Sequence, residues 1–171
     1  MSGGDAGAAV PVVPSLTGRV ILHLDADCFY AQVEHRRLKI PMDVPLAVQQ
    51  WAGLIAVNYA ARAHGISRHM TADEATKACP DIRLVHVELI TDKDTEKAEA
   101  NDDGAEAPAD PSVGGDRTTD KVTLRRYREA SAEIFQCLQR FGTVEKASID
   151  EAYLDITTEV EAELRAADAV L

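Results

Sequence analysis

The chain has 171 residues, of which 46% are hydrophobic and 27% charged, and a formal net charge of −11 at pH 7. This composition is typical of a globular domain with its own core, and no stretch of the sequence resembles a membrane span. Three widely spaced cysteines favour reduced thiols in the cytosol or nucleus over a disulfide framework or a zinc site. The acidic balance gives no support for strong DNA binding by this chain alone.

The N-terminal part is predicted to lead into one strand and one helix. Residues 1–18 are rich in Ala, Gly, Pro and Ser, lack the features of a secretory signal, and are predicted as a disordered lead-in. A branched apolar run then predicts a strand that ends near Asp25, and residues 28–37 show the spacing of a helix. Asp25 and Asp27 therefore lie between a rigid strand and a helix start.

The next region is predicted as a hairpin followed by two short helices. Apolar runs at 45–50 and 54–57 flank a short loop that contains glycine. Asn58 is suited to cap a helix that ends at Gly65, and residues 71–74 form the capping-box pattern that opens a further helix.

Most of the acidity lies in one segment. Between Glu88 and Asp120 there are 11 acidic and three basic residues, which leaves 18 acidic and 15 basic residues elsewhere. Residues 89–120 are predicted as a disordered acidic insert because they contain few large apolar side chains. The insert follows a strand predicted at 82–87.

The last third of the chain is predicted as helix, two strands and helix. Apolar residues recur at helical spacing over 124–141, and Gly142 marks the end of that helix. Short strands are predicted at 143–149 and 152–156, and a final helix starts near residue 158. The order of elements predicts an α+β fold with helices on one face of a mainly antiparallel sheet. We expect both acidic strand ends to meet on that sheet.

Four carboxylates follow the two apolar strands, at Asp25, Asp27, Asp150 and Glu151. Hard divalent cations such as magnesium prefer oxygen ligands, and two such ions support phosphoryl transfer. Either acidic pair taken alone is better explained as ordinary loop acids. The repetition of the pattern favours a metal site that includes Asp25.

A second group of residues has the chemistry of a phosphate clamp. Tyr59 and Arg62 are three residues apart on one predicted helix face, and Arg68 lies just after the following turn. Arginine binds phosphate oxygens through a planar fork, and tyrosine adds a hydroxyl donor. A solvated helix face with one core tyrosine explains the same spacing.

Other conspicuous residues have simple structural explanations. We expect Cys28 to be a small buried residue rather than a nucleophile, because no histidine is adjacent in sequence. His23 is predicted to lie on a strand face. The basic residues of the long helix are predicted to form a solvated face, namely Arg125, Arg126 and Arg128.

Three sequence blocks together resemble the Y-family translesion DNA polymerases. They are residues 24–34, residues 55–62 with 65–68, and residues 147–153, in the order of the family. The resemblance covers residues 19–171 except the acidic insert.

The resemblance implies a polymerase palm in which Asp25, Asp150 and Glu151 are catalytic and bind two Mg²⁺ ions, with the Ala26 carbonyl as a further ligand. It implies that Tyr30 excludes the ribose 2′-hydroxyl. The nucleotide-binding residues that it implies are Cys28, Phe29, Tyr30, Tyr59, Arg62 and Arg68. It also implies that Gln50 approaches the templating base.

The division into domains that follows from the resemblance is a palm interrupted by a small fingers subdomain. The expected segments are a first palm part at 19–41, fingers at 42–80, a palm strand at 81–88, the insert at 89–120 and a truncated second palm part at 121–171.

The activity that the resemblance implies is template-directed DNA synthesis across damaged DNA, carried out in the nucleus. The implied partners are primer–template DNA, deoxynucleoside triphosphates and a sliding clamp that binds a missing C-terminal tail. No membrane is implied. The family continues beyond Leu171 with a thumb, a little-finger domain and a palm lysine. The alternative expectation is therefore a truncated, non-catalytic fragment that binds metal or nucleotide weakly. A nucleotidyl cyclase-like palm explains the carboxylates but neither Tyr30 nor the phosphate clamp. The short loop near Trp51 and the long insert favour a divergent, fungal-type member.

Overall fold

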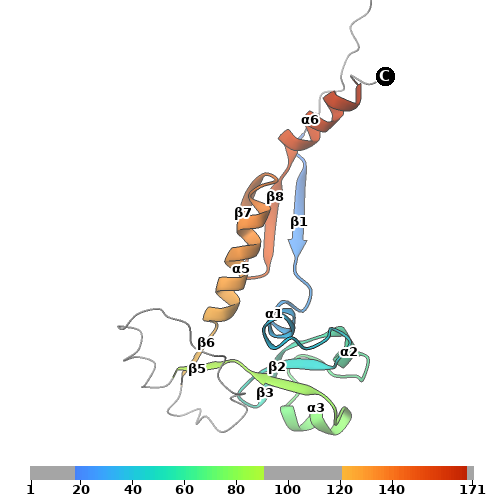
Figure 1. Ribbon diagram of the computed structural model, residues 1–171, viewed down its shortest axis with the longest axis vertical. Coiled ribbons are helices and arrows are strands. Elements are labelled where there is room, and N and C mark those ends of the chain that lie inside the picture. Colours follow the sequence, from blue (N-terminus) through green and yellow to red (C-terminus); the bar gives the residue numbers. More distant parts are fainter. Residues whose placement is uncertain (1–17, 91–120, 169–171) are drawn as a thin grey trace, which may run out of the picture. The chain divides into compact units, whose positions relative to one another are not determined.

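The computed structural model describes residues 18–90 and 121–168 (Figure 1). The chain divides into two compact units, one formed by Ala26–Glu133 and the other by Met1–Asp25 with Ile134–Leu171. Each unit carries one of the two groups of site residues expected from the sequence.

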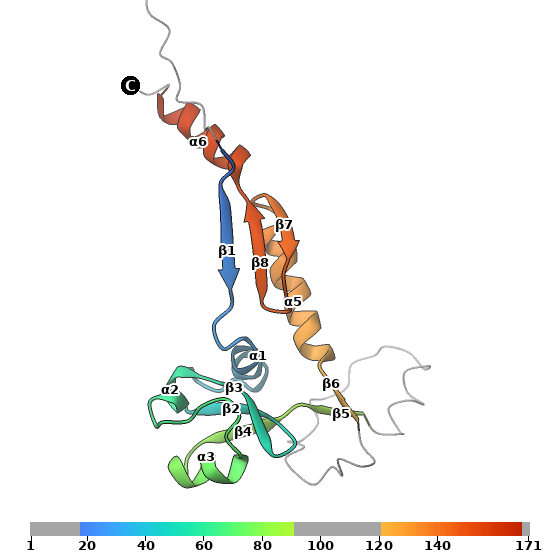
Figure 2. The ribbon, with the colours of Figure 1, turned by 180° about the vertical axis from the view of Figure 1, so that it is seen from behind.

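The unit that contains the chain's two ends is built on an antiparallel sheet with the strand order β1-β8-β7 (Figure 2). Its elements are β1 (Ile21–Asp25), the C-terminal part of α5 (Arg125–Leu138), β7 (Thr143–Lys146), β8 (Glu151–Asp155) and α6 (Thr157–Asp168). From Ile134 on, α5 lies along the side of the sheet formed by β7 and β8 in both ribbon views. Lys146 Nζ lies 4.8 Å from the centroid of the Phe135 ring and ties β7 to this helix.

Gly142 is required where the chain turns from α5 into β7. A Cβ atom at this position would overlap the carbonyl group of Asp155 on the adjacent strand, and the residue has φ +159°. The predicted stop signal at Gly142 therefore has a second cause, which is the close approach of β8.

The other unit is built on a three-stranded sheet with the order β3-β2-β4, in which β2 is antiparallel to β3 and parallel to β4. Its elements are α1 (Phe29–Leu38), β2 (Leu46–Gln50), β3 (Gly53–Val57), α2 (Tyr59–Arg62), α3 (Ala72–Ala78), β4 (Arg83–His86), β5 (Glu88–Ile90), β6 (Lys121–Thr123) and the first turns of α5. The core beneath α2 and α3 is apolar and contains Ala47, Leu54, Val57, Ala61, Ile66, Ala75, Cys79 and Ile82.

Asn58 connects several elements of this unit through its buried side chain. Its Oδ1 accepts hydrogen bonds from Ala61 N at 2.9 Å, which caps α2, and from Leu46 N at 3.0 Å. Its Nδ2 lies 2.9 Å from His35 Nε2 on α1 and donates to Val44 O at 2.8 Å. The predicted cap is thus confirmed, and it also fixes α1 and the start of β2 against α2.

Most predicted elements occur where the sequence places them, with small differences at the ends. The hairpin of β2 and β3 and the capping box of α3 are confirmed. The helix expected over residues 59–64 is shorter, as α2 ends at Arg62, and α5 ends at Leu138 rather than at residue 141. The lead-in lies outside the described residues up to residue 17, as does the insert over residues 91–120.

The tertiary structure corrects two expectations and adds the partner of one predicted strand. The strand predicted at 82–87 is β4, and it pairs with β2. An apolar run does not reveal its pairing partner, and the connection through α3 brings β4 back parallel to β2. Leu89 and Ile90, expected in the insert, belong to β5, which pairs with β6.

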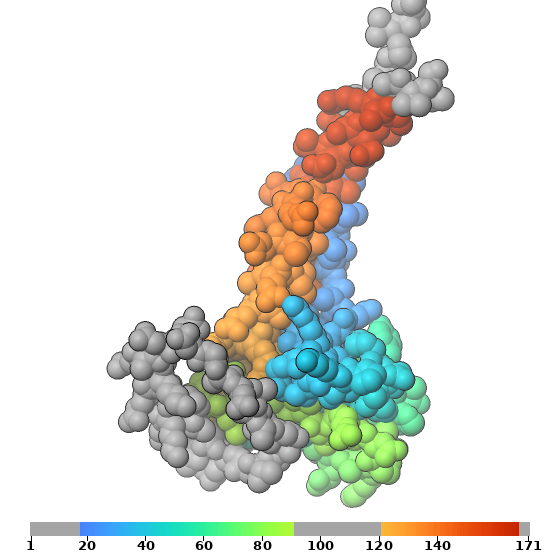
Figure 3. All heavy atoms as spheres, viewed as in Figure 1, coloured from blue at the N-terminus to red at the C-terminus, as the bar shows by residue number. Residues whose placement is uncertain are grey.

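The second correction concerns the basic face of α5. Most of α5 is solvent-exposed, and the helix is visible at the surface in Figure 3. Arg126 is nevertheless half-buried and binds Glu34 of α1. The helix period alone could not distinguish this position from its exposed neighbours Arg125 and Arg128. Among the residues that the structure describes, no helix is long and apolar enough to cross a membrane.

Candidate functional site

The acidic residues of the two motifs meet at one end of the β1–β8 strand pair. Asp25 is the last residue of β1, Glu151 is the first residue of β8, and the two are direct partners in the antiparallel register. Asp150 comes immediately before β8. The expectation that both acidic strand ends meet on the sheet is therefore confirmed for the backbone positions of these residues.

The turn before β8 is organised by the hydroxyl group of Ser148. Its Oγ donates a hydrogen bond to Asp150 Oδ1 at 2.7 Å and accepts from the backbone nitrogens of Asp150 at 3.2 Å and Glu151 at 3.1 Å. The backbone nitrogens of Ala147 and Ser148 both donate to Glu151 O. Ser148 thus orients the carboxylate of Asp150 and holds the start of β8.

The donor chemistry of this strand end fits a hard divalent cation, because Asp25, Asp150 and Glu151 all offer carboxylate oxygens. Within residues 18–90 and 121–168, however, no group of three or more His, Cys, Asp or Glu side chains is already gathered in a metal-binding arrangement. The three carboxylates lie at the same end of the β1–β8 strand pair. Their side chains would have to converge to bind an ion.

The expected phosphate clamp is partly assembled in the other unit. The guanidinium carbon of Arg62 lies 5.1 Å from the centroid of the Tyr59 ring, and Arg62 Nε donates to Val57 O at 3.1 Å. A hydrogen bond with the carboxylate of Asp27 raises the pKa of Tyr59. Asp27, Tyr59 and Arg62 therefore lie together on the solvent side of α2, with Tyr59 exposed.

Cys28 lies beside this group at the start of α1. It has φ 48°, in the left-handed region, and its side chain does not cap the helix. Burial raises the pKa of the Cys28 thiol more than the neighbouring Arg62 lowers it, so the residue is not an activated nucleophile.

The next two residues have different environments. The Phe29 side chain is buried. Tyr30 is half-buried, and its ring stacks on that of Tyr127 with centroids 4.2 Å apart. Sequence reasoning identified Tyr30 but treated Tyr127 only as one apolar position of a helix.

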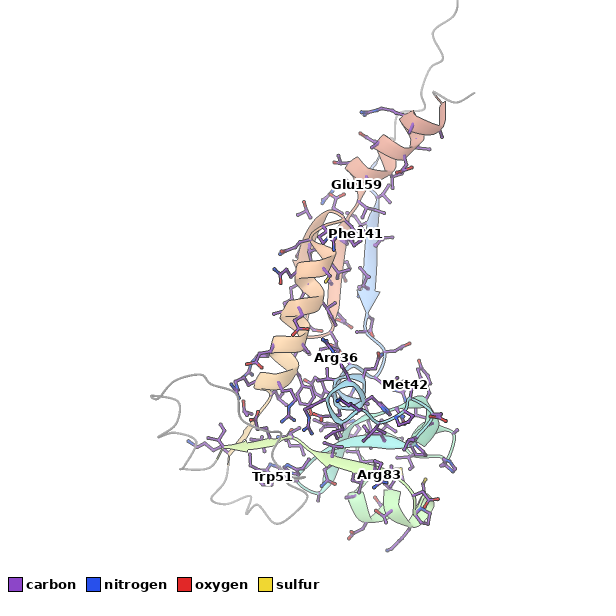
Figure 4. All side chains as sticks on the ribbon, in the orientation of Figure 1. Arg36, Met42, Trp51, Arg83, Phe141 and Glu159 are labelled. Carbon is purple, nitrogen blue, oxygen red and sulfur yellow. The ribbon has the colours of Figure 1, made fainter. Side chains whose placement is uncertain are left out.

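Gln50 ends β2 at a tight turn that a histidine stabilises. Trp51, labelled in Figure 4, has φ 57° and donates its backbone N–H to His86 Nε2 at 2.9 Å. The rings of Trp51 and His86 meet edge to face at 5.5 Å. Arg68, the last of the expected residues, is exposed on the loop that follows Gly65.

Residues 24–170 match the model of the impB/mucB/samB family. The chain belongs to the impB/mucB/samB family. The match includes every expected site residue and confirms the resemblance to Y-family polymerases.

Relatives of this impB/mucB/samB chain include large proteins of which it covers a small part. It is 42% identical over 148 residues to DNA polymerase eta of Drosophila melanogaster, covering 83% of this chain and 14% of that protein. It is 40% identical over 151 residues to DNA polymerase eta of Arabidopsis thaliana, covering 85% and 18%. It is 44% identical over 143 residues to N-acetyltransferase eso1 of Schizosaccharomyces pombe, covering 83% and 15%. The chain therefore spans less than a fifth of the length of these relatives.

Three further residues of the impB/mucB/samB chain support the expected site residues and were missed from sequence. Ser148 holds Asp150, and Tyr127 with Glu34 lies behind Tyr30. The only sequence signal for Ser148 was its place in the Ser-Ile-Asp-Glu block. A glutamate within a helix, such as Glu34, gives no sign of burial in the sequence.

Proposed function

We propose that this chain is part of a DNA polymerase that synthesises DNA across damaged template bases. Membership of the impB/mucB/samB family and the relatives named DNA polymerase eta support the proposal. The observation that carries it is the register pairing of Asp25 with Glu151, next to Asp150, at the end of a rigid strand pair.

In this proposal Asp25, Asp150, Glu151 and the Ala26 carbonyl hold two Mg²⁺ ions. When bound, the ions would lower the barrier to attack of the primer 3′-hydroxyl on the α-phosphorus and stabilise the pyrophosphate that leaves. The protein's own contribution is to fix the carboxylates, which the Ser148 turn does for Asp150.

The second group of residues binds the incoming nucleotide in this proposal. Tyr59 and Arg62 offer a hydroxyl and a guanidinium to the triphosphate, Arg68 adds an exposed charge, and the start of α1 at Cys28 and Phe29 contributes backbone N–H donors. Their donors stabilise the charge that spreads over the phosphate oxygens during transfer.

The remaining roles are assigned by the same proposal. Tyr30 excludes the ribose 2′-hydroxyl, and Gln50, held at the Trp51 turn, approaches the templating base. The eukaryotic relatives named polymerase eta support a nuclear location. A sliding clamp is proposed as a further partner of the full-length protein.

Primer extension by the full-length protein tests the proposal. Asp150→Asn is expected to reduce extension in magnesium by at least about 1,000-fold, because it removes one carboxylate charge at the metal site. Glu145→Gln is the matched control, since Glu145 is an exposed carboxylate on β7 of the same sheet, and it should retain extension within about twofold. Retained extension in Asp150→Asn would contradict the proposed role.

A second candidate function applies to the 171-residue chain on its own, which covers only 14% of the length of the Drosophila relative. In this second candidate function, the isolated chain binds magnesium or a deoxynucleoside triphosphate weakly and does not extend a primer. Extension by the isolated chain, abolished by Asp150→Asn, would overturn this alternative.

A further inference from the structure

A buried carboxylate joins α1 to the first turn of α5. The side chain of Glu34 is 0% exposed and has polar partners at both oxygens. Oε2 accepts from Arg37 Nε at 2.7 Å, and Oε1 accepts from Arg126 Nη1 at 3.0 Å and from the Tyr127 hydroxyl at 2.8 Å. The two guanidinium groups offset the cost of burying the charge.

This cluster fixes the orientation of Tyr127. The residue is 0% exposed, and its only rotatable polar group donates to Glu34. Burial and the adjacent carboxylate hold the pKa of Tyr127 well above its ordinary value, so the hydroxyl stays a neutral donor at every working pH. With its ring enclosed and its hydroxyl anchored, Tyr127 has little freedom to move.

Tyr30 rests on this fixed ring. The two tyrosine rings are stacked with a centroid distance of 4.2 Å and an interplanar angle of 25°. The Phe29 ring lies at 5.9 Å from that of Tyr30 and is tilted by 57°. Stacking at this distance restricts the side-chain rotamers that Tyr30 can adopt on α1.

We propose that Tyr127, anchored by Glu34, is a positioning residue that sets how strictly the polymerase rejects ribonucleotides. It acts through Tyr30, because a fully buried ring does not contact a nucleotide itself. The proposal rests on the proposed function, in which Tyr30 selects the sugar. A Tyr30 ring without its support would move away from a 2′-hydroxyl at a small cost in stacking energy.

The test compares kcat/KM for a deoxynucleoside triphosphate and its ribonucleoside counterpart in the full-length protein. Tyr30→Ala is the reference variant and should raise ribonucleotide use relative to deoxyribonucleotide use by at least about tenfold. Tyr127→Leu should raise the same ratio about 3- to 10-fold, the range expected from loss of one aromatic pair. Tyr127→Phe keeps the stacked ring but loses the hydroxyl that Glu34 anchors, so it should raise the ratio by less than Tyr127→Leu does, about 2- to 3-fold.

A matched control breaks another contact between α1 and α5. Arg36, labelled in Figure 4, pairs with Glu133 at 3.1 Å, but both side chains are largely exposed, at 81% and 63%. Glu133→Gln should leave the ratio unchanged. If Tyr127→Leu does not fold, Glu34→Gln replaces it, since it changes the charge and not the volume, with an expected rise of about 2- to 5-fold.

The outcomes separate the inference from the proposed function. If Tyr30→Ala raises the ratio but Tyr127→Leu, or Glu34→Gln in its place, lowers use of both nucleotides equally, Tyr127 is only structural and the inference is overturned. If Tyr30→Ala leaves the ratio unchanged, the proposed role of Tyr30 fails and the inference fails with it. A rise of the ratio in both variants, absent in Glu133→Gln, supports both.

Discussion

The Ser148 hydroxyl makes its three hydrogen bonds within one turn, to the carboxylate of Asp150 and to two backbone nitrogens. A residue that orients a metal-binding carboxylate contributes to activity without touching the substrate, and loss of such partners typically costs 10- to 100-fold. Substitution of Ser148 should therefore separate the effect of orienting the Asp150 carboxylate from the effect of binding the nucleotide.

Ser148→Ala is expected to lower kcat for primer extension about 10-fold and to change KM for the nucleotide by less than about twofold. The free energy of unfolding should fall by about 1 kcal/mol, since the turn loses its side-chain acceptor. Ser67→Ala, in the exposed loop after α2, is the control. An unchanged kcat would show that Asp150 is oriented without the hydroxyl.

At the residue level, the sequence indicates the candidate site residues but not the contacts that support them. Asp25, Asp150 and Glu151 could be recognised because acidic residues directly after apolar strands are unusual and occur twice. Arg126 could not be distinguished from Arg125, because both lie in one helical turn and only the buried Glu34 selects between them.

Local signals define the short elements of the chain well. The capping box of α3 forms as predicted, with Glu74 N donating to Thr71 Oγ1 at 3.2 Å and Thr71 N donating to Glu74 Oε2 at 2.8 Å. The hydrogen bond from Thr71 N is the largest cause that lowers the pKa of Glu74. Capping could be predicted because its partners are three residues apart.

Thr71→Ala is expected to destabilise the protein by about 1 kcal/mol through loss of the cap. Urea denaturation followed by circular dichroism measures this change, and hydrogen exchange should show faster exchange in α3 first. Thr76→Ala is the matched control, because the Thr76 hydroxyl bonds only to Ala72 O one turn earlier in the same helix. Equal effects of the two substitutions would contradict the capping role.

The local sequence of a strand does not show which other strand it pairs with. Residues 82–87 were correctly predicted as a strand, but an apolar run fits a parallel neighbour as well as an antiparallel one, and β4 pairs with β2. Gly142 shows the same limit, since its position after a helix was predicted while its close approach to β8 was not.

Gly142→Ala is expected to lower the free energy of unfolding by about 2–4 kcal/mol, because the added Cβ would overlap the Asp155 carbonyl and force β7 and β8 apart. Gly53→Ala is the matched control: Gly53 starts β3, and a Cβ there meets no atom within 4 Å. Thermal denaturation of the two variants measures the difference. A melting temperature for Gly142→Ala equal to that of Gly53→Ala would exclude the overlap.

Across the whole chain, the two groups of site residues fall in two compact units, and one division between the units lies between Asp25 and Ala26. The pairing of β1 with β8 joins segments more than 120 residues apart. It was predictable only because both strands end in acids that one metal site would need. The net charge of −11 does not show whether acidic residues form a metal site, because residues at such a site and residues on a solvated surface contribute the same charge to the total.

A side-chain contact between the two chain segments of the unit that carries Asp25 predicts how that unit responds to acid. Asp155, at the end of β8, accepts hydrogen bonds from the Thr157 hydroxyl at 2.6 Å and from Arg19 Nη2 at 2.7 Å, and these contacts lower the pKa of Asp155 to about 2. Because the pKa is lower in the folded state, the contribution of Asp155 to stability is complete above its ordinary pKa near 4 and is lost as pH falls towards 2. Melting temperatures measured between pH 5 and 2 should therefore fall less steeply with decreasing pH in Asp155→Asn than in the wild type. Glu145→Gln should follow the wild-type curve, and parallel curves for all three proteins would contradict the assignment.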